Sequence, residues 1–296
     1  MMGRVTLQTM AAAAHRNLES SSAKLAQAQQ SAMDLKKYAN VSDNPSAAAD
    51  SLAVRAQQAA SAQYARNISD GTNWLATADS AMASVTTLLQ RAQDLTLQGA
   101  NGATTPAGRE AIATELESIR AELLTQANTK YLGRSIFAGN SNQGAAFTDN
   151  PLNYTGDPSV TVERRISSGA QVRVDADGAA IFGTTDGDPV FTLLSNIAGA
   201  LRTPGGDVTG HLGALDKAVN RAIDGRAELG TRQAQLLRAQ KTNVDGAVDL
   251  ENQRSSIEDL DLGKAILDVK TQELAYQAAL SITAKVLQPT LMDFLR

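Results

Sequence analysis

Apolar and small residues near the amino terminus recur in alternating steps of four and three. This spacing is typical of a helix that packs along another helix through a narrow seam. It predicts a long helix from about Val5 to Lys37. The seam positions of this helix are Ala14, Leu18, Ser21, Leu25, Ala28, Ala32 and Leu35.

The carboxyl-terminal region repeats the same rhythm, and Glu273 and Thr283 interrupt it. Both terminal segments are therefore predicted to be coiled-coil helices. Because the two seams are narrow and rich in small residues, neither helix can bury much apolar area alone, and we expect them to pair with each other or with neighbours. The carboxyl-terminal seam positions are Leu262, Ile266, Val269, Tyr276, Leu280 and Leu287.

A helix stops and a new one starts in the stretch "VSDNPSAAADSLAVRAQ", residues 41–57. Asn44 is a favoured N-cap residue, and Pro45 suits the first helical position because it has no amide hydrogen to satisfy. The alanines that follow favour helix propagation. The sequence therefore predicts a joint made of Ser42, Asp43, Asn44 and Pro45, with a second helix beginning at Pro45.

Three further helical runs carry apolar residues on one face and predict an antiparallel bundle. The second run follows the turn "NGATTP", where Thr105 can cap and Pro106 can open the helix. The apolar positions are Ile68, Leu75, Ala78, Met82, Val85, Leu89 and Ala92 in the first run, Ile112, Leu116, Ile119 and Leu123 in the second, and Leu212, Leu215, Val219, Ala222, Leu229 and Leu236 in the third.

The residue pattern changes between about Lys130 and Pro189. Short segments in which apolar and polar residues alternate, such as those around Val162 and Val174, are bounded there by Gly, Asn and Asp. These segments predict strands with tight turns. The predicted fold is mainly α: an elongated helical bundle with terminal coiled-coil helices and a small central β insertion domain that projects from it. The predicted parts are 1–40 (inner helix), 41–139 (bundle), 140–190 (β insertion), 191–255 (bundle return) and 256–296 (inner helix).

Composition narrows the possible functions. Aromatic residues make up only 4% of the 296 residues, a thin supply for one large globular core. The net charge of −4 has no basic stripe, which argues against nucleic acid as a partner. Cysteine is absent, so disulfides and thiol catalysis are excluded. No window approaches the roughly 18 apolar residues of a membrane span, and the first residues lack the apolar core of a secretory signal.

Residue patterns for catalysis are also lacking, so we expect no enzyme activity, metal or cofactor. His15 and His211 lie in separate helical patterns and are more simply surface or packed residues than catalytic bases. The segment "DADG", 175–178, begins like a calcium loop but lacks the closing Glu, so a hairpin turn is the simpler interpretation. The pair Arg164 and Arg165 reads as a solvated strand edge, and Trp74 as a core residue.

The order of these parts, and several motifs within them, resemble the flagellin family, and within it the proteins of the hook–filament junction. The joint and its alanine-rich helix are similar to the family's Ser-Asp-(Asp/Asn)-Pro segment. The other matching stretches are "RNISDGTNWLATADSAMASVTTLLQRAQDLTLQGANGA" (66–103), "LTQANTKYLGRSIFAGN" (124–140) and "LAYQAALSITAKVLQPTLMDFLR" (274–296).

The resemblance implies a secreted structural subunit of the bacterial flagellum that polymerises through its terminal helices. Its implied partners are hook-associated protein 1, flagellin, copies of itself in a ring-like layer, and an export chaperone at the carboxyl-terminal helix. It also implies type III export and a change of radius at the joint, with the return crossing near 252–261. Two alternatives stay open: a flagellin that builds the filament, and a cytoplasmic coiled-coil adaptor.

Overall fold

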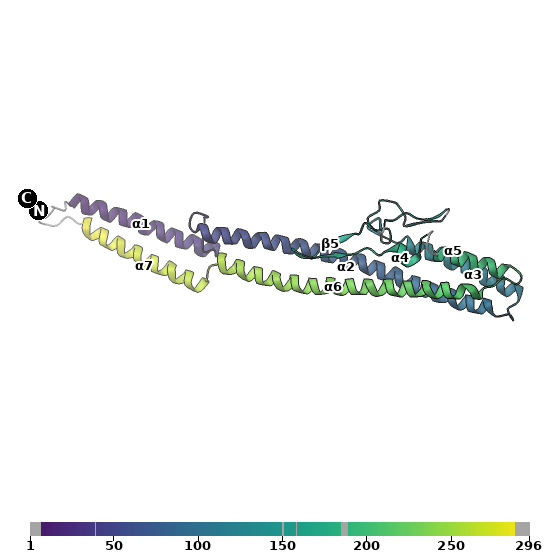
Figure 1. Ribbon diagram of the computed structural model, residues 1–296. Coiled ribbons are helices and arrows are strands. Elements are labelled where there is room, and N and C mark those ends of the chain that lie inside the picture. The colour runs from purple at the N-terminus through teal and green to yellow at the C-terminus, as the bar shows by residue number, and fades with distance from the viewer. Residues whose placement is uncertain (1–6, 39, 150, 158, 185–188, 288–296) are drawn as a thin grey trace, which may run out of the picture. The chain divides into compact units, whose positions relative to one another are not determined.

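The computed structural model describes residues 7–38, 40–149, 151–157, 159–184 and 189–287. Helices dominate these residues (Figure 1). This confirms the predicted mainly α class. The helices are α1 (Leu7–Asp34), α2 (Pro45–Ala100), α3 (Pro106–Ala127), α4 (Gly178–Phe182), α5 (Val190–Arg202), α6 (Leu212–Glu258) and α7 (Leu262–Leu287), with a 3-10 turn at Thr209–His211.

The described strands are short and form three separate antiparallel pairs. In the second pair Phe147 lies opposite Tyr154, and in the third Arg164 lies opposite Val172. None of these pairs extends into a larger sheet within the described residues. The strands are β1 (Lys130–Tyr131), β2 (Arg134–Ser135), β3 (Phe147–Asp149), β4 (Leu152–Tyr154), β5 (Glu163–Arg165) and β6 (Gln171–Arg173).

The chain divides into two compact units. We call residues 61–246 the core unit, and residues 1–60 together with 247–296 the terminal unit. Helices α2 and α6 each contribute residues to both units. The domain boundaries expected from the sequence remain a prediction.

The core unit buries one continuous set of apolar side chains on the facing sides of its helices. All the apolar positions expected in the first two helical runs are buried, and in the third run only Leu212 is half-buried rather than buried. Helix α5, which packs on α3, was not expected from the sequence (Figure 1). Its signal is present, because Leu194, Ile197 and Leu201 recur at helical spacing and are buried.

The β region is part of this core and not a projecting insertion. Phe182 stacks on Phe191 of α5 at 5.7 Å between ring centroids and meets Phe137 and Phe147 edge-on, each at 5.4 Å. The short strands lie against the helices because an isolated two-stranded pair is only marginally stable, and the bounds 140–190 of the insertion stay a prediction. These aromatic side chains are buried only where the strands lie against the helices.

Two local expectations also differ from the structure. Arg164 is not a solvated edge residue: its Nε donates to Asp70 Oδ2 at 2.6 Å, and its guanidinium lies 5.6 Å from the ring centre of Trp74, which is buried as expected. The "DADG" segment is not a hairpin turn: Asp175 is fully buried and accepts from the Arg173 guanidinium, while Asp177 caps α4.

The terminal unit contains α1 and α7, which lie side by side (Figure 1). Helix α1 ends at Asp34, three residues earlier than the pattern suggested, because Leu35 adopts a left-handed backbone with φ of 52°. The carbonyl of Leu35 accepts from the amide of Leu260 at 2.9 Å. This contact joins the end of α1 to the segment between α6 and α7.

Candidate functional site

The candidate site was sought first among metal-binding groups and membrane-spanning helices. They contain no group of three or more His, Cys, Asp or Glu side chains that could hold a metal ion. No described helix is both long enough and apolar enough to span a bilayer. We therefore built the candidate site from the helices and joint of the terminal unit.

The contact between α1 and α7 is thin. On α7 only Ala265 and Thr283 are buried among the described side chains. The half-buried positions are Val269, Gln272, Glu273, Tyr276 and Ala279. Among the α1 residues whose exposure is described, none is fully buried. Since buried apolar area is the main source of helix–helix stability, this pair is weakly held by its own contact.

The seam positions expected from the sequence fall into two groups. Leu18, Leu25, Val269 and Tyr276 are half-buried in the pair, and Thr283 lies in the contact although it seemed to interrupt the seam. The small seam residues Ala14, Ser21, Ala28 and Ala32 of α1 are half-buried as well. Other expected positions are largely exposed. Leu262, Ile266 and Leu280 are between 42% and 57% exposed, Leu35 lies beyond the end of α1 and is exposed, and Leu287 ends α7 with a side chain outside the described set.

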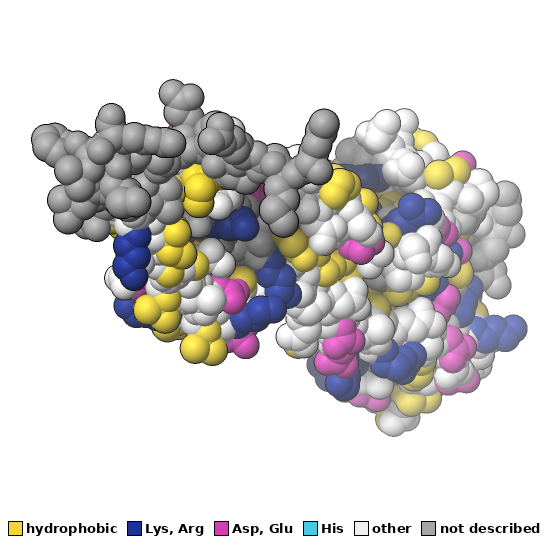
Figure 2. Space-filling view, turned by 90° about the vertical axis from the view of Figure 1, so that its left-hand side faces the viewer, with side chains coloured by type: hydrophobic (Ala, Val, Ile, Leu, Met, Phe, Trp, Pro, Cys, Tyr) yellow, Lys and Arg dark blue, Asp and Glu magenta, His cyan; other side chains and the backbone are white. Residues whose placement is uncertain are grey.

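Helix α7 also carries a further apolar face that the sequence pattern did not single out. Leu267 and Leu274 are 69% and 67% exposed, and Ile282 is 59% exposed. At about 100° per residue, Leu267 and Leu274 lie on the side of α7 turned away from α1, and Ile282 lies on its flank. The spacing of seven residues between Leu267 and Leu274 could have indicated this face from the sequence. Helix α7 thus carries apolar residues on the side that contacts α1, on its flanks and on the opposite side. Figure 2 shows hydrophobic side chains among charged ones on the surface.

The joint residues form the cap expected from their types. The Asn44 side-chain oxygen accepts from the amide of Ala47 at 3.0 Å, and α2 begins at Pro45. Before it, Asp43 closes a tight turn, because its carboxylate accepts from the Asn40 amide at 2.9 Å. Ser42 is an exposed turn residue. The local geometry matches the expected helix start, while the role of these residues as a joint between domains stays a prediction.

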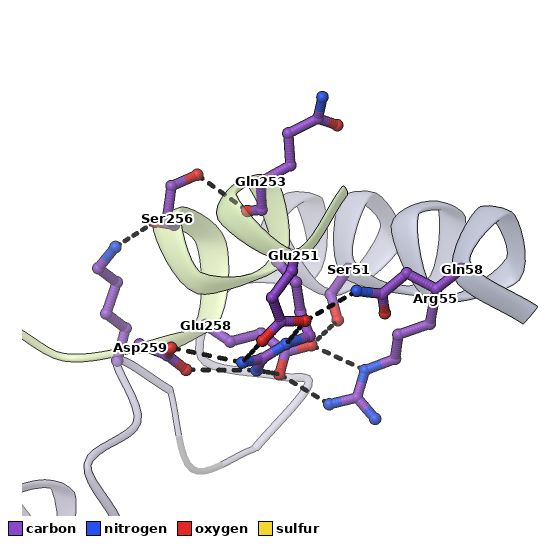
Figure 3. A network of polar contacts seen from close by, with 10 residues as sticks. Ser51, Arg55, Gln58, Glu251, Gln253, Ser256, Glu258 and Asp259 are labelled. Atoms are coloured by element: carbon purple, nitrogen blue, oxygen red, sulfur yellow. Dashed lines mark hydrogen bonds and ion pairs between the residues drawn. The ribbon is translucent and has the colours of Figure 1, made fainter. Parts of the chain in front are cut away.

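A network of charged side chains holds the start of α2 against the end of α6 (Figure 3). Its centre is Glu258, whose carboxylate accepts from Arg55 Nε at 2.8 Å and Nη2 at 2.7 Å, and from the hydroxyl of Ser51. Arg254 donates to Glu258 at 3.1 Å and also pairs with Glu251 at 2.8 Å. The backbone of Glu258 accepts from the Lys37 amide at 2.8 Å, which adds the end of α1.

Charges and hydrogen bonds within the network shift the pKa values of its side chains. Hydrogen bonds from Arg55 and then Ser51 favour the carboxylate form and lower the pKa of Glu258 to about 2. The same contact raises the pKa of Arg55 above its ordinary value. The network is therefore fully charged at neutral pH. It ties the first turns of α2 to the last turns of α6.

Two family models match this chain. The bacterial flagellin N-terminal helical region matches residues 5–142, and the bacterial flagellin C-terminal helical region matches residues 212–295. Flagellar hook-associated protein 3 of Salmonella typhimurium is 30% identical over 268 residues, which are 82% of this chain and 84% of that protein. The chain belongs to the flagellin family. It is a structural protein of the bacterial flagellum.

Other relatives fit this assignment. Flagellar hook-associated protein 3 of Escherichia coli is 28% identical over 82% of this chain and 84% of its own. A solved flagellar hook-associated protein from Vibrio parahaemolyticus has a TM-score of 0.68 at 20% identity, over 73% of this chain and all of that one. The flagellar junction protein FlgL of Legionella pneumophila has a TM-score of 0.59 at 13% identity, over 71% of this chain and all of that one. These two structures share the fold.

Proposed function

We propose that this chain joins the flagellar hook to the filament and polymerises through α1 and α7. The observation that carries the proposal is the set of exposed apolar residues on α7, which the contact with α1 leaves uncovered. Fully burying one Leu or Ile side chain is worth about 1.5–3 kcal/mol, so covering this set in an assembly supplies energy that the pair lacks alone.

The partners follow from a junction role. A subunit between hook and filament contacts hook-associated protein 1 on one side, flagellin on the other, and copies of itself in its own layer. An export chaperone would cover the carboxyl-terminal helix before assembly, since its exposed leucines would otherwise aggregate. We propose a structural role for this helical surface, because exposed apolar residues suit packing against other helices.

A filament subunit is the second candidate, because flagellin of Listeria monocytogenes is 25% identical over 75% of this chain. The two functions differ in where the protein is found. A junction protein is confined to the tip of the hook, whereas a filament subunit is abundant along the filament. Deleting the gene should leave hooks without filaments if the junction function is correct, and secreted flagellin should then be found in the medium.

The substitution Leu280→Asp tests the assembly surface. Leu280 is 42% exposed, so a carboxylate there should leave the thermal unfolding of the purified monomer unchanged. In the assembly the same carboxylate would be buried without a partner, which costs several kcal/mol, so the variant should be missing from isolated hooks. Ser281→Asp places the same charge seven residues after Leu274, on the opposite exposed face of α7, and so tests whether that face is covered as well. A Leu280→Asp protein that still supports filaments would contradict the proposal.

A further inference from the structure

The chain contains a single Asn-Gly pair, Asn101-Gly102, in the turn that links α2 to α3. Both residues are exposed. A side chain added at Gly102 would meet no atom within 4 Å, so no other part of the fold crowds the backbone there. Because glycine has no Cβ to obstruct the approach, its backbone nitrogen can reach the side-chain amide of the asparagine before it.

The reacting groups of this pair are held in place by the turn. The Asn101 side-chain oxygen accepts from the Ala103 amide at 3.1 Å, and the Asn101 carbonyl accepts from the Thr104 amide at 3.0 Å. These two bonds fix the asparagine side chain against the turn. Within the described part of the chain the Gly102 amide has no hydrogen-bond partner. Its nitrogen is therefore available as a nucleophile.

The Ala103 amide is placed to stabilise the intermediate of such an attack. A bond from the Gly102 nitrogen to the side-chain carbon of Asn101 turns the side-chain oxygen into an oxyanion. The Ala103 N–H, 3.1 Å from that oxygen, already points at the charge that develops, as a donor in an oxyanion hole does. The folded turn thus brings together a nucleophile, an electrophile and a donor from three consecutive residues.

The Asp-Gly pairs of the described residues lack this arrangement. The pairs at 70–71, 224–225 and 245–246 lie inside α2 and α6, where helical hydrogen bonding engages the glycine amide. The Gly178 amide donates to the Phe137 carbonyl at 3.2 Å. An amide that is already bonded is a poorer nucleophile, so the turn after α2 differs from these positions in its backbone as well as in its asparagine.

We propose that Asn101 is a site of spontaneous covalent modification. The Gly102 nitrogen loses its proton to water and bonds to the Asn101 side-chain carbon, the C–N bond of the side-chain amide breaks, and ammonia leaves with a proton from water. Water then opens the five-membered succinimide ring at either carbonyl. The product is aspartate, or isoaspartate in which the backbone runs through the side chain. Either product places a carboxylate just beyond the last turn of α2, where the helix dipole is negative, and so weakens that turn.

Ageing the purified full-length chain in mildly alkaline buffer tests the proposal. Peptide mapping by mass spectrometry should find the amide-to-acid mass gain at residue 101, and isoaspartyl methyltransferase should label the isoaspartate there. The folded chain should form product at least as fast as the same chain unfolded in guanidinium chloride at equal ionic strength, because only the fold holds the Ala103 amide on the oxyanion. A slower rate in the folded chain would overturn the proposal.

Two variants separate ring closure from direct hydrolysis by water. The methyl group of Gly102→Ala meets no other part of the fold but stands beside the attacking nitrogen, so this variant should unfold at the same temperature and form product about tenfold more slowly. Ala103→Gly keeps the amide that donates to the oxyanion and is the matched control, which should age like the unsubstituted chain. Equal rates in Gly102→Ala and the unsubstituted chain, or aspartate without isoaspartate, would mean direct hydrolysis and would overturn the proposal.

Discussion

The core unit and the α1–α7 pair are both helical, but they bury their apolar residues to very different extents. The core unit surrounds a cluster that includes Trp74, Phe137, Phe182 and Phe191, each no more than 1% exposed. The α1–α7 pair fully buries only Ala265 and Thr283 among its described side chains. The core unit can therefore be stable alone, whereas the pair has most of its apolar area left for partners.

On the proposed function, this difference lets the same chain be a folded monomer and an assembly subunit. A surface that must form an interface after export cannot be satisfied within the monomer. Helix α7 keeps Leu267, Leu274 and Ile282 in solvent, and the cost is a weakly held helix pair. The network around Glu258 holds the start of α2 and the end of α6 together through polar contacts, which need little apolar burial.

The largest expected effect is in the aromatic cluster. Phe182→Ala removes a ring that contacts three other phenylalanines and should lower the free energy of unfolding by about 3–5 kcal/mol. Leu274→Ala on α7 removes an exposed side chain and should change it by less than about 0.5 kcal/mol. Urea denaturation of both purified variants measures the difference. Equal losses would show that the two regions form one cooperative core.

A smaller loss of stability is expected at the joint as the pH falls. Because the pKa of Glu258 is lowered to about 2 in the folded chain, its contribution is complete above the ordinary glutamate pKa and is lost as pH drops toward 2. Glu258→Gln should remove about 1 kcal/mol at neutral pH, the scale of a charged hydrogen bond near solvent.

Hydrogen exchange at pH 7 and pH 3 would localise this effect at the joint. The first turns of α2 and the last turn of α6 should exchange faster in the Glu258→Gln variant, and the gap between the two proteins should narrow at pH 3. Glu115→Gln, whose exposed carboxylate pairs with Arg91 in the core unit, is a control that should leave the joint unchanged. A gap that widens in acid would contradict the assigned sign.

Local effects of about the same size as that of Glu258→Gln are expected at two helix caps, one in each unit. Thr105 accepts from the Gly108 amide at 3.1 Å and Asn44 from the Ala47 amide at 3.0 Å. Replacing either with Ala should cost about 1 kcal/mol locally. Thr105→Ala should shift the global unfolding midpoint, because α3 belongs to the core. Asn44→Ala should speed amide exchange near residue 47 with no global shift, and a global shift from it would place this turn in the core as well.

Several elements could be predicted from the sequence because their signals are local. The start of α2 at Pro45 depends on a cap and a proline, and the buried faces of α2, α3 and α6 depend on helical spacing. Helix α5 has the same helical spacing of apolar residues. It was missed because the strand-like residue pattern before it made its first residue hard to recognise. Residue types alone were enough wherever neighbours in the sequence are also neighbours in space.

The sequence by itself determined the helical class, the family resemblance and the heptad rhythm of the terminal segments. It could not decide which apolar positions of α7 meet α1, because Val269 and Ile266 are equally apolar and differ only in the direction they face. Nor could it place Phe182 among the helices or bring Arg55 to Glu258, which are 203 residues apart. Such contacts depend on how separate segments pack, and only the tertiary structure decides which part of each helix is covered and which remains available to a partner.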